Sequence, residues 1–341
     1  MRKARIKLED GSGYYHTMSR VIEGRMALGV EEKEFFRNLM RLAEDFCGVR
    51  ILTYAIMTNH WHLLVDVPVR EEISDAELIR RVKLFYSKEI VKELHRRLEE
   101  FRAAADDVNA RRTRETYTYR MYEVSEFGKL LKQRFTQWYN RKHGRRGTLW
   151  EDRFKSVLVE RSEKALGTMA AYIDLNSVRA GLVKDPKDYR YSGYGEAVAG
   201  VKQARDGIER VMRGFGLKGD WAKVGAEYRK YLYVSGSVKG LDEQGRTVKA
   251  GLSQKDMESV LKEEGQLSVA EALRCRVRYF SDGAVFGSKE FVNDVFRKNR
   301  REFGLKRKTG ARAMTGGDFG GLCTMRALRQ DVITSGQSKS Q

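Results

Sequence analysis

The hydrophobic positions along the chain change period several times before residue 200, which indicates alternating strands and helices. Runs rich in β-branched and aromatic residues predict strands at 14–22, 49–57, 60–67 and 154–160. Spacings of three and four predict helices at 31–46, 74–101, 126–142 and 162–181. We therefore expect an α+β fold in which a four-stranded, mainly antiparallel sheet carries packed helices, with the strand order left open.

Local features refine three of these segments. The helix at 31–46 is expected to bury a stripe formed by Phe35, Leu39, Leu42 and Phe46. Ser74 and Glu77 form a capping box that predicts the start of the next helix. The polar residues 104–116 are expected to form an exposed break.

Beyond residue 200 the pattern weakens, and we expect residues 1–200 to form one domain. Residues 201–250 carry several glycines and mixed charges and are interpreted as a connector. Residues 251–333 predict a small helical domain with helices at 253–264, 268–280 and 288–303. The turn 281–287 suits a helix-turn-helix-like unit with its second helix on DNA, although a basic helix exposed to solvent explains the same letters equally well. Residues 334–341 are expected to be disordered.

The composition favours a polyanionic partner. The 341 residues carry a formal net charge of +19 at pH 7, and self-repulsion of this size disfavours a compact chain unless counter-charge is met. Nucleic acid is the first candidate and a membrane surface the second. No apolar stretch approaches the roughly 20 residues of a spanning helix, and no signal peptide is visible at the start. Cys47, Cys275 and Cys323 lack paired zinc spacing and predict reduced thiols, so we expect a cytoplasmic, nucleoid-associated protein with no membrane partner.

His60-Trp61-His62 lies in the predicted strand 60–67. Side chains two apart on a strand project from the same face, so the two imidazoles, roughly 7 Å apart at their backbones, can share one divalent metal ion. Leu63 and Val65 fall on the opposite face. An isolated His-x-His pair more often lies on an edge strand without a chemical role. The residues that favour a chemical role for this pair come later in the sequence.

Tyr172 and Asn176 are one turn apart on the helix predicted at 162–181, so their side chains point the same way. Beside a metal-binding histidine pair, a phenol suits nucleophilic attack on a phosphodiester while the ion polarises a phosphate oxygen. Other tyrosines fit less well. Tyr139 continues a core stripe, Tyr14 and Tyr15 open the first strand, and Tyr189, Tyr191 and Tyr194 occupy a polar stretch where they could stack on bases.

Four motifs in order then resemble the HUH single-tyrosine transposases, with the REP-associated tyrosine transposases as the closest branch. They are the runs 60–62, Gly147 to Ser156, Tyr172 to Val183 and Asp188 to Ser192. The resemblance covers about residues 10–200 and implies a ferredoxin-like core. It also implies that His60 and His62 bind a divalent ion, that Tyr172 is the nucleophile, and that Asn176 is a polar third ligand. Ser177 departs from the proline that the family commonly has after the Asn.

Two clusters of cations are candidate DNA contacts. The glycine-containing loop 141–150 is suited to follow a phosphate backbone, and it carries the cations Arg141, Lys142, Arg145 and Arg146. Trp150 in this loop is interpreted as structural, and His143 is left out of the metal site. The second cluster follows the helix predicted at 288–303 and supplies Arg297, Arg300, Arg301, Lys306 and Arg307.

These features favour an enzyme that uses Mg²⁺ or Mn²⁺ to nick and rejoin single-stranded hairpin DNA through a 5′-phosphotyrosine, as the resemblance implies. A domesticated protein that holds hairpin DNA without cleaving it is the alternative. A hydrolase of small phosphoesters would leave the charge of +19 unexplained. The sequence leaves open whether the protein is a monomer or a homodimer, and whether Tyr172 acts within its own chain.

Overall fold

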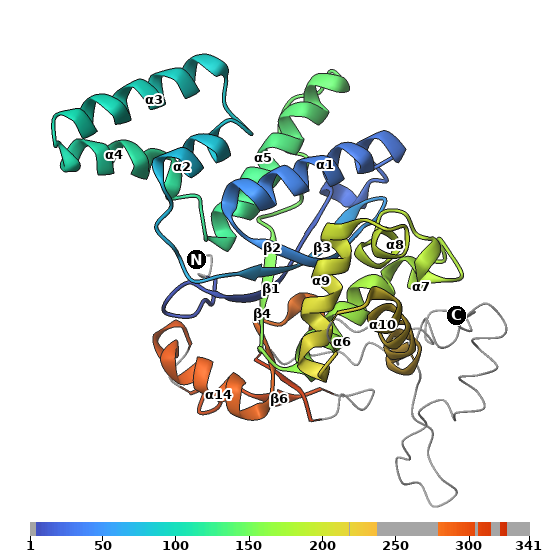
Figure 1. Ribbon diagram of the computed structural model, residues 1–341. Helices are drawn as coiled ribbons and strands as arrows, with labels where there is room; N and C mark the ends of the chain where they lie inside the picture. Colours follow the sequence, from blue (N-terminus) through green and yellow to red (C-terminus); the bar gives the residue numbers. More distant parts are fainter. Residues whose placement is uncertain (1–4, 218, 237–278, 304–305, 315–320, 326–341) are drawn as a thin grey trace, which may run out of the picture.

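The computed structural model describes residues 5–217, 219–236, 279–303, 306–314 and 321–325 (Figure 1). It has the α+β fold that the sequence predicts. Its centre is a seven-stranded sheet in the order β2-β3-β1-β4-β5-β7-β6. The strands are β1 Gly13–Arg20, β2 Arg50–Ile56, β3 His60–Val67, β4 Lys155–Val159, β5 Val285–Gly287, β6 Arg312–Ala313 and β7 Cys323–Thr324.

The first four strands confirm the predicted antiparallel sheet. β1 lies between β3 and β4 and runs antiparallel to both, and β2 pairs antiparallel with the outer side of β3. The register places Met18 opposite His62 and Arg20 opposite His60. Because opposed residues share a face and alternate residues return to it, His16 lies on the same face as the two histidines.

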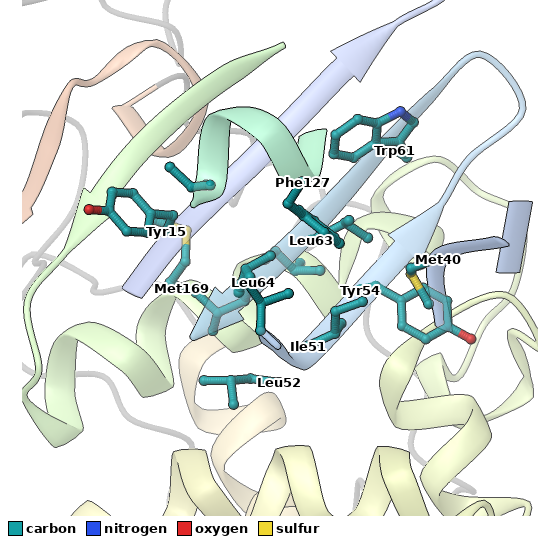
Figure 2. Packing of buried hydrophobic residues seen from close by; sticks show 14 of the residues in the cluster. Tyr15, Met40, Ile51, Leu52, Tyr54, Trp61, Leu63, Leu64, Phe127 and Met169 are labelled. Carbon is teal, nitrogen blue, oxygen red and sulfur yellow. The ribbon is translucent and has the colours of Figure 1, made fainter. Parts of the chain in front are cut away.

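Helices α1 (Val30–Cys47) and α5 (Val124–Lys142) pack side by side on one face of this sheet. Figure 2 shows the buried side chains that connect strands and helices, among them Trp61, Leu63 and Phe127. The prediction of a buried stripe on α1 is wrong at Leu42, whose side chain is 41% exposed. The buried face is centred on Phe36 and Met40 instead, because Phe36 meets Trp61 on β3 at a ring distance of 5.7 Å.

The other face is covered by α6 (Glu163–Asp174), α8 (Gly193–Val198) and α9 (Lys202–Met212), and α10 (Trp221–Gly236) packs on α6 and α9. The helix expected at 162–181 begins as predicted, because the Ser162 side chain caps α6, but α6 ends at Asp174 and a short α7 (Asn176–Arg179) follows. Gly181, at a φ of 68°, ends this pair. A Cβ on Gly207 would lie 2.3 Å from the Leu52 carbonyl oxygen. This close approach shows that α9, inside the expected connector, packs directly on β2.

The helix predicted at 74–101 is interrupted. Ser74 caps α2 (Asp75–Val82) as expected, but Ser87 caps a second helix, α3 (Lys88–Ala103), by accepting from the Ile90 amide. The exposed break expected at 104–116 is wrong, since α4 (Asp107–Thr118) occupies most of it and begins at an Asp106 cap. α3 and α4 lie side by side, away from the sheet (Figure 1).

The described part of the C-terminal region joins the sheet. α13 (Tyr279–Asp282) leads into β5, which pairs parallel with β4, and α14 (Lys289–Lys298) follows. The expected turn 281–287 therefore contains a strand, and the helix expected at 288–303 gives way to a 3-10 turn at Arg300–Glu302. The helix expected at 253–264, most of that at 268–280, Cys275 and the tail 334–341 lie outside the described residues. The division into domains stays a prediction.

Three further 3-10 turns complete the described elements, at Ile22–Gly24, Pro186–Asp188 and Arg213–Phe215. Cys47 and Cys323 are buried free thiols. Within the described ranges, no helix has the length and apolar character needed to cross a membrane.

Candidate active site

Three histidines converge on one face of the sheet. His60 and His62 come from β3, and their ring centroids lie 5.0 Å apart. His16 comes from β1, and its ring lies 5.0 Å from that of His62 at an interplanar angle of only 19°. His16 and His62 are buried, at 0% and 2% exposure. The pair predicted from the sequence is therefore accompanied by a third imidazole that sequence reasoning missed.

Tyr172 lies against this cluster from α6. Its ring meets His62 edge-on at a centroid distance of 5.8 Å and His16 at 5.9 Å. The Ser162 cap fixes the start of α6, and Met169 and Ile173 are buried on either side of the tyrosine along the helix. The structure thus brings together the residue predicted as nucleophile and one histidine of the predicted metal pair, although residues 62 and 172 are far apart in the sequence.

Asn176 follows where α6 gives way to α7. Its amide nitrogen donates to the carbonyl oxygens of Tyr172 and Ile173, at 3.1 and 3.2 Å. These two bonds use the nitrogen, so the carboxamide oxygen is the atom that could bind a metal. Its role as a third ligand stays a prediction. Among the residues that the structure describes, no group of three His, Cys, Asp or Glu side chains could hold a metal ion.

Each histidine of the predicted metal pair has its Nδ1 atom engaged. His62 Nδ1 lies 2.8 Å from His16 Nε2, and His60 Nδ1 lies 2.6 Å from Asn59 Oδ1. On the far side of the His16 ring, Nδ1 lies 2.6 Å from the Phe280 carbonyl oxygen. Hydrogen bonds at Nδ1 are the usual support for a histidine that binds a metal through Nε2. The chemistry of these donors, two imidazoles and an amide oxygen, therefore suits a divalent ion.

Burial keeps the rings of His16 and His62 neutral. It lowers the pKa of His16 to about 4. Burial is also the main cause that lowers the pKa of His62 well below its usual value, and the charges of His60, His16, Arg179 and Arg20 add to it. A neutral imidazole is the form that binds metals. Both buried rings are therefore ready for this at neutral pH without first losing a proton.

Arg179 gives the site a cation that the sequence did not single out. Its guanidinium lies 4.4 Å from the centre of the Tyr172 ring and donates to the Tyr172 carbonyl. Arg20, opposite His60 on β1, adds a second positive charge near His62. The spacing of seven residues from Tyr172 to Arg179, two helical turns, was a signal that could have identified it. Positive charge beside a phenol suits an anionic substrate.

Phe280 completes the site from the C-terminal region. Its ring lies 4.7 Å from that of Tyr172, and its carbonyl oxygen contacts His16. The side chain is 4% exposed. Nothing in the local sequence around residue 280 indicated this contact, because it depends on the pairing of β5 with β4.

Five of the six other candidate tyrosines are buried, and Tyr14 is partly buried. Tyr139 is buried among aromatic rings, as expected, and Tyr15 is buried on β1. The expectation that Tyr189, Tyr191 and Tyr194 could stack on bases is wrong, because all three are buried. The Tyr189 hydroxyl donates to the Ile56 carbonyl at 2.7 Å.

The loop 141–150 is partly neutralised. Lys142 forms ion pairs with Glu31 and Glu32, and His143 Nε2 also contacts Glu32, at 3.1 Å. Trp150 is buried and donates to the Thr136 hydroxyl, which confirms a structural role. The Arg145 guanidinium lies over the Tyr139 ring, while Arg141 and Arg146 are exposed. Of the four predicted DNA contacts in this loop, these last two are the most accessible.

The C-terminal cluster is similarly mixed. Arg297 pairs with Asp294, and Arg300 donates to the Phe303 carbonyl. Arg307 donates to the carbonyls of Gly310 and Met325, so it holds two segments of this region together. Arg297, Arg301 and Lys306 are exposed, and among these three Arg297 is the one that pairs with Asp294.

A match to a family model supports the resemblance for the first of the four motifs. Residues 11–104 match the family described as Transposase IS200 like. The match covers under a third of the chain and includes β1, the His60-Trp61-His62 strand and His16. One solved structure is similar, that of a REP-associated tyrosine transposase bound to a REP hairpin. The identity is 14% over 59% of this chain and 85% of that chain, with a TM-score of 0.34. No curated protein matches the chain.

The predicted resemblance to IS200-like transposases is thereby confirmed for the strands that carry the histidines. Tyr172 and Asn176 lie beyond the matched residues. Their assignment rests on the motifs in the sequence and on the contacts of Tyr172 with the histidine cluster.

Proposed function

We propose that this protein is a metal-dependent DNA strand transferase that nicks and rejoins single-stranded hairpin DNA. The observation that carries the proposal is the contact of Tyr172 with the histidine cluster, in the same chain as an IS200-like transposase match. A nucleophile and a metal-binding pair are the two parts that such chemistry needs. The charge of +19 favours a nucleic acid as the substrate.

His60, His62 and the oxygen of Asn176 would hold Mg²⁺ or Mn²⁺, which when bound would polarise a phosphate oxygen. Tyr172 loses its proton and its oxygen bonds to the phosphorus. The bond from phosphorus to the 3′ oxygen breaks, and that oxygen takes up a proton. The products are a 5′-phosphotyrosine and a free 3′-hydroxyl, and attack by a 3′-hydroxyl in the reverse sense rejoins the strands.

Arg179 and Arg20 have a role in this scheme that follows from their charge. A phosphodiester that approaches Tyr172 brings negative charge to a site whose two buried histidines, His16 and His62, are neutral, and the two guanidinium groups attract it. Arg179 also fixes the end of the helix that carries Tyr172, through its bond to the Tyr172 carbonyl. It therefore combines attraction of the substrate with orientation of the nucleophile.

The direct test is covalent capture. Labelled hairpin DNA with a single-stranded flank is incubated with the protein and Mg²⁺ or Mn²⁺, then boiled in detergent and separated by electrophoresis. We expect label on the wild-type protein and none on Tyr172→Phe, which keeps the ring and loses only the hydroxyl. Tyr139→Phe, at a buried tyrosine outside the site, is the matched control and should retain the adduct.

Two results would contradict the proposal in different ways. An adduct in Tyr172→Phe would place the nucleophile elsewhere. Tight hairpin binding by wild-type protein with no adduct at either metal would favour the alternative, a domesticated protein that holds hairpin DNA without cleaving it.

A further inference from the structure

We propose that His16 is a positioning residue that fixes which nitrogen of His62 faces the metal, and that the Phe280 main chain sets His16. This rests on the proposed function in that His62 is taken as a metal ligand. The residues involved belong to β1, β3 and α13, so the inference links the C-terminal region to the chemistry of the histidine strand.

The first step concerns the proton on His16. A carbonyl oxygen only accepts hydrogen bonds, so His16 Nδ1, 2.6 Å from the Phe280 oxygen, carries a proton and donates it. A neutral imidazole that donates from Nδ1 has a lone pair on Nε2. His16 Nε2 is therefore an acceptor.

The second step passes this assignment to His62. Its Nδ1 lies 2.8 Å from His16 Nε2, so His62 Nδ1 is the donor in this bond. The lone pair of His62 is then on Nε2, which lies on the other side of the ring from His16. Main-chain geometry at residue 280 thus determines that His62 offers Nε2, and no other nitrogen, to an ion.

Burial disfavours any other placement of the protons on His16 and His62. His16 is 0% exposed and His62 is 2% exposed, so exchange with bulk water cannot easily replace either bond. A buried donor or acceptor left without a partner costs about 1–3 kcal/mol. If His62 carried its proton on Nε2 instead, its Nδ1 and His16 Nε2 would be two acceptors facing each other at 2.8 Å.

His60 shows the same arrangement built from different residues. The Asn59 amide nitrogen donates to the Gly24 carbonyl at 3.0 Å, which turns its oxygen towards His60 Nδ1. His60 Nδ1 is therefore also a donor, and its Nε2 also carries the lone pair. In both histidines of the pair, a main-chain carbonyl two hydrogen bonds away thus determines which ring nitrogen carries the proton. A contact that served only packing would not require this arrangement.

Two substitutions at His16 separate positioning from packing. His16→Gln offers an amide nitrogen for the Phe280 oxygen and an amide oxygen for His62 Nδ1, so it can reproduce both bonds. His16→Phe fills a similar volume and can make neither. Thr17→Val is the control, because Thr17 is buried on the same strand but faces the opposite side of the sheet.

Two measurements on the full chain, both without DNA, test the inference. Mn²⁺ titration followed by electron paramagnetic resonance gives the affinity for the ion, and nitrogen-15 NMR of the histidine rings gives the protonated nitrogen of His62 directly in the wild-type protein. Loss of hydrogen-bond support for a ligating histidine typically weakens metal affinity about 10- to 100-fold. We expect a loss of this size in His16→Phe, near-complete recovery in His16→Gln, and wild-type affinity in Thr17→Val.

The inference is overturned if His62 carries its proton on Nε2 in the wild-type protein, a result that does not depend on any variant folding. It is also overturned if folded His16→Phe binds Mn²⁺ as tightly as wild type. Covalent capture distinguishes this from failure of the proposed function. If the wild-type protein forms the adduct but His16→Phe binds Mn²⁺ with unchanged affinity, only the inference about His16 is contradicted. If Mn²⁺ binding depends on His16 but no adduct forms, the inference about His16 holds and the proposed strand transfer is contradicted.

Discussion

The two faces of the antiparallel sheet use one strand, β3, in opposite ways. Trp61 and Leu63 point towards α1 and α5 and are held by packing against rings and aliphatic chains. His60 and His62 point towards α6 and are held by hydrogen bonds at their Nδ1 atoms. Burial does not distinguish Trp61 from His62, which are 0% and 2% exposed. The difference lies in the means of stabilisation, so neighbouring residues should fail in different ways when they are replaced.

The largest effect is expected for His62→Ala, which should eliminate covalent capture of hairpin DNA at every Mg²⁺ concentration tested. The reason is that His60, the other imidazole of β3, is itself a proposed ligand and cannot also replace His62. His95→Ala, at an exposed histidine on α3, serves as the control and should retain capture. If His62→Ala still forms the covalent adduct with hairpin DNA at the wild-type level, the histidine pair has no role in the reaction.

Trp61→Ala should instead act on stability. Replacing a fully buried tryptophan by alanine typically costs about 3–5 kcal/mol, and the ring of Trp61 contacts Phe36 and Trp150 on its own face. Urea unfolding should show this loss, while the fraction that remains folded at low temperature should still capture hairpin DNA. A stable but inactive Trp61→Ala would show that the two faces are not separable.

Asp174 tests how the polar face is stabilised away from the histidines. This carboxylate is 0% exposed and accepts hydrogen bonds from Thr53, Tyr228 and the Tyr194 amide. Burial, the largest cause, raises its pKa to about 6 from 3.8 despite these bonds. Between these values the folded state binds the proton more tightly than the unfolded state, so the free energy of unfolding falls as the pH rises from about 4 to 6.

Asp174→Asn should flatten that part of the curve, because the amide keeps the acceptor for Thr53 and Tyr194 and has no charge to bury. The difference in slope between the two proteins, integrated over the window, should reach at most about 3 kcal/mol. Urea unfolding at several pH values measures it. Parallel curves for the two proteins would mean that Asp174 does not titrate in this range.

The smallest effect concerns the exposed cations. Arg301→Ala with Lys306→Ala, and separately Arg141→Ala with Arg146→Ala, should each make the dependence of hairpin affinity on salt shallower. Each lost phosphate contact changes the slope of log K against log salt by about 0.7 for single strands. Arg297→Ala should change it less, because Asp294 already neutralises this guanidinium. Equal slopes throughout would identify both clusters as solvated surface.

The parts that the sequence predicted depend on local signals. Four strands and the face shared by His60 and His62 follow from alternation, and Ser162 marked the start of α6 through its capping bond. Where a second local signal competed, periodicity failed. Ser87 restarts a helix that the apolar spacing alone would have continued, and Asp106 starts α4 in a stretch too polar to show a stripe.

The missing parts of the site depend on pairing between distant segments. His16 reaches His62 only because of the register of β1 and β3, and no local pattern fixes that register. Phe280 reaches His16 and Tyr172 across a still longer interval of sequence. Local sequence patterns could therefore identify the predicted nucleophile and the predicted ligands. They could not identify His16 and Phe280, which orient these residues.

The parallel pairing of β5 with β4 also sets an order of events during protein synthesis. Leu158 and Glu160 donate their amides to Ala284 and Phe286, so that side of β4 has its described partners only in residues made much later. At about 5–20 residues per second, the ribosome needs roughly 6 to 25 seconds to pass from β4 to β5. During that interval β4 is an exposed edge strand, which other chains can pair with. The nascent chain therefore carries a risk of aggregation at β4 until β5 is made and pairs with it.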